Sequence, residues 1–200
     1  MTVARGAQIR AGLAVHVSAG KAAAVLLLLP LLLAVFPVPW ASPAEPEDEV
    51  KAVAVLNFLR YSTWPAPAAG MMTVGVLGRR GFLETLRATL ENRPVNGRNV
   101  RVTEVKSAAD APACQLVYFA TERRSEIGPV LAGAVAARAL TVGECDRFLD
   151  YGGSVNLFVV DGHISFEASL EAIGRTGITV SSNLLRVGQV RDLGRHGAPK

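Results

Sequence analysis

The chain has 200 residues, of which 50% are hydrophobic and 19% are charged. That length predicts one domain, or two at most, and the composition excludes an intrinsically disordered chain. The 21 basic and 17 acidic residues are unevenly placed, because residues 1–44 hold three of the bases and no acid. The rest of the chain is nearly neutral and lacks the clustered positive charge of a nucleic-acid-binding protein, and two cysteines are too few for a structural zinc site.

Residues 1–44 have the pattern of a secretory signal peptide. Three basic residues precede the apolar run Ala22–Phe36, and small residues follow it. We expect cleavage after Ala44, which leaves a domain on the exported, periplasmic side of the membrane. A cut after Ala41 is one alternative, and an uncleaved anchor of about 20 residues over 22–41 is another.

The first part of the domain alternates helices and strands. The acidic opening 45–49 and the apolar segment Lys51–Leu59 predict a largely buried helix, which ends before Trp64-Pro65. The segments that follow are predicted strands at Thr73–Leu77, Val100–Val105, Gln115–Ala120 and Ala139–Val142, helices at Phe82–Leu90 and Glu126–Arg138, and helical turns at Ser107–Asp110 and Arg147–Tyr151. Such alternation favours a parallel sheet that is flanked by helices.

The last part of the domain begins with a hairpin. Asp161-Gly162 joins the predicted strands Val155–Val160 and His163–Glu167, and this dipeptide favours a type I′ turn between antiparallel strands. The remaining predicted elements are a helix capped by Ser169 and ended by Gly177, an extended segment Ile178–Val180, a turn Ser181–Arg186 and a polar tail over residues 191–200. The sequence thus predicts a single α/β domain over residues 45–190, with a mostly parallel sheet flanked by helices and an antiparallel hairpin at its C-terminal edge.

Catalytic and cofactor motifs do not emerge from the sequence, and we predict no catalytic, cofactor-binding or metal site. The glycines around the first strand are spaced G-x-x-G-x-x-G, which differs from the dinucleotide-binding pattern, and no G-x-S-x-G motif is present. His163 is interpreted as a surface histidine on a strand. The acidic residues Glu144, Asp146 and Asp150 are interpreted as a solvated turn.

Short motifs in a fixed order resemble the YfiR/HmsC-like family of periplasmic proteins over residues 50–188. The motifs are Lys51-Ala52, Asn57-Phe58, Arg60-Tyr61, Trp64-Pro65, Val74–Gly78, Asn96-Gly97, Val100–Val102, Cys114–Phe119, Leu140–Gly143, Gly152-Gly153, Ile164–Glu167, Leu170 and Ile178–Leu185. The resemblance implies a regulator without catalytic activity. Such a regulator binds the periplasmic sensor region of an inner-membrane diguanylate cyclase, or a related sensor protein, and lowers cyclic di-GMP and biofilm formation.

The hairpin and the turn after it are the expected docking region, because short elements at a sheet edge are common docking surfaces. The candidate partner-binding residues are His163, Phe166, Glu167, Leu184 and Leu185. For Glu167 a structural carboxylate and a catalytic acid remain alternatives. A homodimer also stays open, and so do two rival functions, a periplasmic receptor for a small ligand and an unrecognised hydrolase.

The two cysteines are expected to be free. Cys114 begins one predicted strand, whereas Cys145 follows the end of the next, so parallel strands separate them by about 13–20 Å. A disulfide needs Cα atoms within about 4.4–6.8 Å. The resemblance implies a different pairing in relatives, in which the partner of the Cys114 position lies on the first strand, where this chain has Gly75. A second departure is Ser169, where the family often has Asn.

Overall fold

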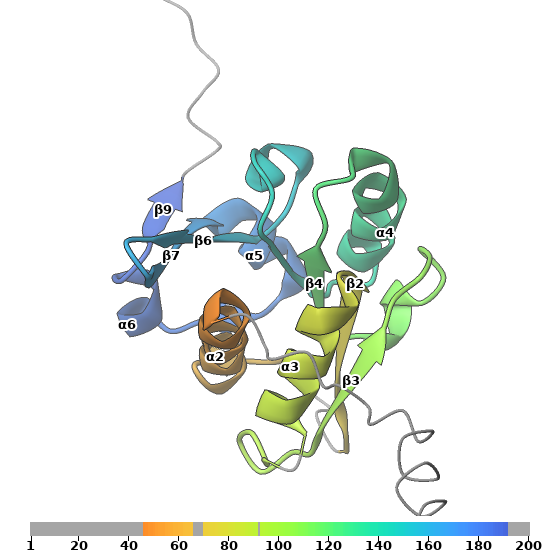
Figure 1. Ribbon diagram of the computed structural model, residues 1–200, viewed down its shortest axis with the longest axis horizontal. Coiled ribbons are helices and arrows are strands. Elements are labelled where there is room, and N and C mark those ends of the chain that lie inside the picture. Colours follow the sequence, from red (N-terminus) through yellow and green to blue (C-terminus); the bar gives the residue numbers. More distant parts are fainter. Residues whose placement is uncertain (1–45, 66–69, 92, 192–200) are drawn as a thin grey trace, which may run out of the picture. The chain divides into compact units, whose positions relative to one another are not determined.

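The computed structural model of the protein describes residues 46–65, 70–91 and 93–191. Its helices and strands follow the predicted order and add two short strands, at Ser62–Thr63 and Gln189–Arg191 (Figure 1). They are α2 (Pro46–Arg60), β1 (Ser62–Thr63), β2 (Met72–Gly78), α3 (Arg80–Leu90), β3 (Val100–Glu104), η1 (Ala111–Ala113), β4 (Leu116–Ala120), α4 (Arg124–Ala136), β5 (Leu140–Gly143), η2 (Phe148–Tyr151), β6 (Val155–Val160), β7 (His163–Ser169), α5 (Leu170–Thr176), β8 (Thr179–Val180), α6 (Ser182–Leu185) and β9 (Gln189–Arg191).

The main sheet has seven strands in the order β3-β2-β4-β5-β6-β7-β9. Strands β2 to β6 pair in parallel, β6 and β7 pair antiparallel, and β9 pairs in parallel with β7. The predicted fold class is therefore confirmed. Two pairings were not foreseen: β9 adds a short strand outside the hairpin, and β1 pairs with β8 in a separate two-stranded sheet.

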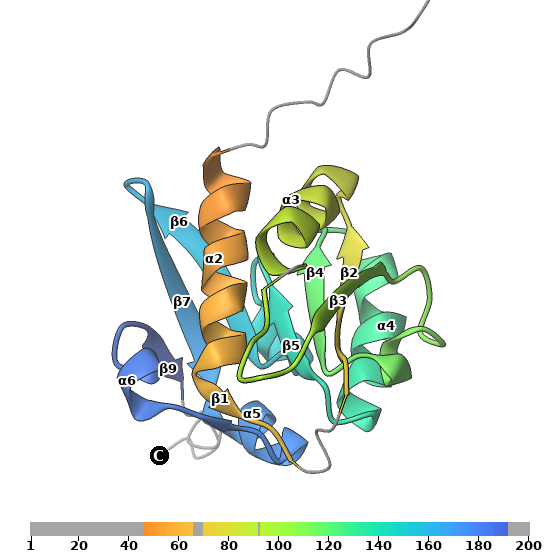
Figure 2. The ribbon, with the colours of Figure 1, turned by 90° about the horizontal axis from the view of Figure 1, so that it is seen from below.

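Helices cover both faces of the main sheet. Helices α2 and α3 lie on one face, and α4 with the short helices η1 and η2 lies on the other (Figures 1 and 2). Two hydrophobic clusters correspond to these two faces, and the larger one contains the buried residues of α2 and α3. Helix α2 is apolar on most sides because it is enclosed by the sheet and by α3, as its sequence predicts.

The predicted hairpin is present in the predicted register. Asp161 and Gly162 both have a positive φ, of 51° and 76°, as a type I′ turn requires. The pairing runs from Val155 opposite Ala168 to Val160 opposite His163. This register decides which side chains share a face, since successive residues of a strand point to opposite faces.

Candidate partner-binding surface

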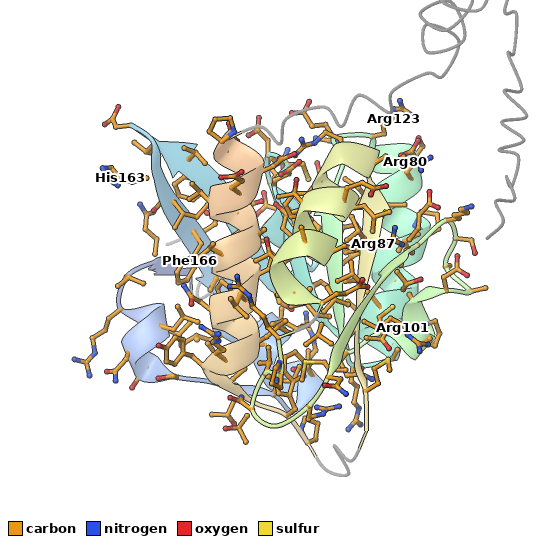
Figure 3. The ribbon with its side chains drawn as sticks, turned by 60° about the horizontal axis from the view of Figure 1, so that its bottom comes forward. Arg80, Arg87, Arg101, Arg123, His163 and Phe166 are labelled. Atoms are coloured by element: carbon orange, nitrogen blue, oxygen red, sulfur yellow. The ribbon has the colours of Figure 1, made fainter. Side chains whose placement is uncertain are left out.

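The inner face of the hairpin belongs to the core. Phe166 is 4% exposed, and its ring meets the ring of Phe58 on α2 edge-on, with centroids 5.1 Å apart. The backbone of Gly188 lies so close to the Phe166 ring that a Cβ atom at position 188 would clash with it. Figure 3 shows Phe166 beside α2. Phe166 was expected among the partner contacts, but its burial by α2 and by the chain before β9 assigns it to the core.

Leu184 and Leu185 lie on α6, and both are half-buried. They pack against the same hydrophobic cluster that contains Phe166. The structure therefore brings three of the five candidate residues together, but it does so on the core side of the sheet. Their apolar surface stabilises the attachment of α6, and only its outer part is open to a partner.

The outer face of the hairpin carries the other two candidates. His163 is exposed at the end of β7 next to the turn (Figure 3). Glu167 is half-buried on the same face, where the Asn156 amide donates a 3.4 Å hydrogen bond to its carboxylate. The register adds Phe158 and Val160 of β6 to this face, and Val160 is 51% exposed. We call the set Phe158, Val160, His163, Ser165 and Glu167 the hairpin face.

The hairpin face combines apolar and polar groups. Within the described residues the side chain of His163 makes no hydrogen bond or ion pair. A nucleophile and an orienting acid would both have to lie within hydrogen-bond reach of a catalytic histidine. The hairpin face thus offers apolar area and charge at its surface, and its histidine is not hydrogen-bonded to a nucleophile or an acid in the part of the chain that the structure describes.

A buried ionic network at the N-terminal end of α2 was missed in the sequence. The side chain of Glu144 is only 10% exposed, so its interpretation as part of a solvated turn is wrong. Its carboxylate accepts hydrogen bonds from Lys51 and Tyr118, both at 2.9 Å, and from Arg79 at 3.0 Å. Arg79 also donates two hydrogen bonds to Asp48, at 3.0 and 2.8 Å. The network joins α2 to the carboxyl ends of β2 and β5.

The pKa values in this network follow from burial and pairing. Burial and the nearby Glu144 charge raise the pKa of Tyr118 well above its usual value, so the hydroxyl stays protonated and donates. Burial alone would lower the pKa of Lys51, but hydrogen bonds to Glu47 and Glu144 raise it overall. The groups of the network are thus hydrogen-bonded to one another, which is the pattern of a structural clamp.

A groove of about 1000 Å³ lies beside this network, at the carboxyl ends of β2, β3 and β4. In open α/β sheets ligands gather at this end, where the strand order reverses between β2 and β4. The cations that line the groove are each paired with a carboxylate: Arg79 with Glu144, Lys106 with Glu104, and Arg123 with Glu126. The groove thus has the position of a ligand site but no cation left unpaired for an anion.

The cysteines lie where the predicted strand directions put them. Strands β4 and β5 are parallel, Cys114 precedes β4, and Cys145 follows β5. Both side chains are buried. A Cβ atom built on Gly75 would lie 3.6 Å from the Cβ of Cys114 and 2.7 Å from its sulfur. Position 75 is therefore next to the Cys114 thiol, as the family resemblance implies.

Two searches of the described residues found no further feature. No group of three or more His, Cys, Asp and Glu side chains there could hold a metal ion. None of the helices in the described ranges is both long and apolar enough to span a bilayer. The predicted leader, its cleavage site after Ala44 and the polar tail beyond residue 191 lie outside the described residues.

The chain is similar to a conserved domain protein of Vibrio cholerae O1 biovar El Tor strain N16961, whose crystal structure is known. The two share 13% sequence identity with a TM-score of 0.49, over 72% of this chain and 60% of that one. A family model described as YfiR/HmsC-like matches residues 48–189, which is most of the chain. The protein therefore belongs to the YfiR/HmsC-like family.

Proposed function

We propose that the protein binds the periplasmic sensor region of an inner-membrane diguanylate cyclase and holds the enzyme inactive, so that cyclic di-GMP and biofilm formation stay low. One observation carries the proposal. The match to the YfiR/HmsC-like family over residues 48–189 suggests a periplasmic regulator of diguanylate cyclase signalling. That family is regulatory rather than catalytic, and the self-paired charges of the Glu144 network agree with a structural role for its ionisable groups.

The hairpin face is the surface that we propose for the contact with the cyclase. It places an exposed valine and a partly exposed phenylalanine beside a histidine and a half-buried carboxylate. Interfaces of this kind combine apolar anchors with a few polar groups that fix orientation. The hairpin face lies near one edge of the sheet. Helix η2 contacts β6 and β7, and we take the rest of the hairpin face as the surface that is open to a partner.

Deletion of the gene tests the regulatory role. In a native host with a functional cyclase, we expect cyclic di-GMP and biofilm to rise on deletion and to return to normal on complementation with the parent gene. Unchanged nucleotide and biofilm levels after deletion would contradict a repressor.

Charge reversal then tests the surface. We expect Glu167→Lys to fail in complementation, because it places a cation in the proposed interface. The matched control is Glu104→Lys, which reverses a carboxylate on β3 at the other edge of the sheet and should complement normally. Since Glu167 also accepts from Asn156, the melting temperature of each variant must be measured alongside.

A second variant separates binding from folding. Val160→Glu adds charge at a side chain that is already half-exposed, so it should leave the free energy of unfolding nearly unchanged. Loss of cyclase binding with an unchanged melting temperature supports the hairpin face. Normal complementation by both Glu167→Lys and Val160→Glu would exclude it.

A further inference from the structure

A second pocket lies at the end of the sheet opposite to the Glu144 network. It has a volume of about 330 Å³ and is reached from the amino end of β4. Its lining comes from five separate parts of the chain, and the residues that matter for the argument are Trp64, Arg98, Cys114, Gln115, Arg138 and Ile178. The volume is at the lower end of the range for small-molecule sites, about 300–1,000 Å³. We call it the amino-end pocket.

The charges of the amino-end pocket are all of one sign. Arg98 and Arg138 line it, and none of its lining residues is an acid. Within the described residues neither guanidinium forms an ion pair, in contrast to the cations of the large groove. The thiol of Cys114 adds no negative charge, because burial raises its pKa to about 11. The pocket therefore presents two uncompensated cations to whatever enters it.

The backbone of Arg98 is fixed by a hydrogen-bonded turn. Val95 and Arg98 exchange two backbone hydrogen bonds, of 2.8 and 3.0 Å, around a turn at Asn96 and Gly97. The Asn96 amide donates to the carbonyl of Arg60 at the end of α2, which fixes the turn to the domain. The Nε of Arg98 is nevertheless buried without a hydrogen-bond partner in the described structure. A buried donor without a partner is rare and costly, and an anion in the pocket would satisfy it.

Arg138 occupies a position where glycine is the usual residue. It follows the end of α4 with a φ of +59°, in the left-handed region that helices commonly use for a terminating glycine. An arginine there is strained relative to glycine. Arg138 thus places a cation on the rim of the amino-end pocket, at a position that glycine would adopt with less strain.

Apolar groups form the other part of the wall. Trp64 packs against the core with part of its ring exposed, and Ile178 and two prolines lie in the same lining. The amide nitrogen of Gln115 is a further donor, because its oxygen is already held by the backbone N–H of Thr73 at 2.7 Å. Guanidinium groups bind carboxylates and phosphates through paired hydrogen bonds, and indole rings contact flat apolar groups.

We propose that the amino-end pocket binds a small organic anion, with a carboxylate or phosphate headgroup held by Arg98 and Arg138 and an apolar body against Trp64. The inference does not rest on the proposed function, since a ligand site here is compatible with either a regulator or a receptor.

Calorimetric titration of the exported protein tests the proposal with four probes that share a benzene ring. Benzoate and phenyl phosphate carry the two candidate headgroups, benzyl alcohol is neutral, and benzylamine is cationic. We expect at least one anion to bind with a Kd below about 1 mM, and the neutral and cationic probes to bind at least about tenfold more weakly. A chain that begins at Glu45 has Trp64 as its single tryptophan, so its fluorescence should change with the same Kd.

Two substitutions locate the binding site. Arg98→Gln and Arg138→Gly should each weaken binding of the anion by about tenfold or more. Arg138→Gly is the safer variant, because glycine takes the positive φ without strain and the fold should be at least as stable. Arg101→Gln is the matched control, since it removes an exposed arginine on β3 (Figure 3) and should leave the Kd unchanged.

Several results would overturn the proposal. They are no saturable binding of either anion below about 1 mM, binding of benzyl alcohol as tight as that of benzoate, or an unchanged Kd in Arg138→Gly. If Arg98→Gln does not fold, Arg138→Gly decides alone. Loss of anion binding with normal complementation of the gene deletion would separate this site from the proposed regulatory role.

Discussion

Lys51 donates a 2.9 Å hydrogen bond to the carboxylate of Glu144, which lies 93 residues further along the chain. The ammonium group also pairs with Glu47 one turn earlier on α2, and the carboxylate is shared with Arg79 and Tyr118. The contact attaches the N-terminal part of α2 to the residue that follows β5. A buried charge in such a network depends on its partners, because removal of one partner leaves the others desolvated with fewer ionic contacts.

Removal of Glu144 is therefore expected to destabilise the domain. We expect Glu144→Ala to lower the free energy of unfolding by about 3 kcal/mol. This value is at the lower end of the range for a buried ion pair, because Lys51 keeps Glu47 as a partner and Arg79 keeps Asp48. Urea unfolding of the exported protein measures this change. The control is Glu171→Ala, which breaks an exposed pair with Arg175 and should cost less than about 0.5 kcal/mol. Equal midpoints for the two variants would contradict a buried clamp.

The neighbourhood of Gly75 and Cys114 gives a second prediction. We expect Gly75→Cys to form a disulfide with Cys114 in the exported protein, because the Cβ separation of 3.6 Å lies within the range for disulfides. Thiol titration of the denatured, non-reduced protein should count two thiols in the parent and one in the variant. The cross-link should stabilise by at most about 4 kcal/mol, and by less if Val105, which would contact the new Cβ, has to move.

Gly128→Cys is the control for that experiment. A Cβ atom at position 128 would meet no neighbour within 4 Å, so this variant adds a cysteine without a partner and should count three thiols. Three thiols in Gly75→Cys as well would contradict the adjacency of the two positions. A count of zero in the parent would contradict the placement of Cys114 and Cys145 at opposite ends of β4 and β5.

Local signals predicted most of the fold. The Asp161-Gly162 turn, the Ser169 cap and the alternation of apolar segments with helices each depend on neighbouring residues, and each is present as predicted. Strand β9 was missed because it has three residues and is defined by its pairing with β7 rather than by its own sequence. The Glu144 network was missed for the same reason, since its partners come from three distant parts of the chain.

The residues of the hairpin face were only partly predictable. Successive residues of β7 point to opposite faces, which separates His163 and Glu167 from Phe166, but both faces of the hairpin carry large apolar residues. Which face turns toward α2 depends on the packing of Phe58 against Phe166, and this contact between distant segments has no local signature. Phe158 and Val160 were not among the candidates, and they join the hairpin face through the register of β6 with β7.

Export gives a third prediction. The step from a basic, acid-free segment to the acidic start of the domain predicts that N-terminal sequencing of the exported protein begins at Glu45. Intact Met1 in the membrane fraction would indicate an anchor over residues 22–41 instead. Ala44→Leu is expected to slow cleavage at this position, because the site requires a small residue, whereas Ala22→Leu in the apolar run should be processed normally.

The final prediction concerns stability at alkaline pH. Burial, and secondarily the charge of Asp110, raises the pKa of Cys114 to about 11 in the folded protein, and burial also raises the pKa of Cys145. A thiol in the unfolded chain titrates near about 8.5. The folded state therefore holds the Cys114 proton more tightly, and this contribution to stability is complete below about pH 8.5 and is lost as the pH rises to about 11. We expect the free energy of unfolding to fall over that interval by at most about 3 kcal/mol from Cys114, with a further decrease from Tyr118, whose pKa is also raised. Urea unfolding between about pH 7 and about pH 11 measures how steeply the free energy of unfolding falls with pH. Cys114→Ala should make the slope shallower, whereas Cys145→Ala should retain most of it, and identical slopes in the parent and Cys114→Ala would show that this thiol is not the group responsible.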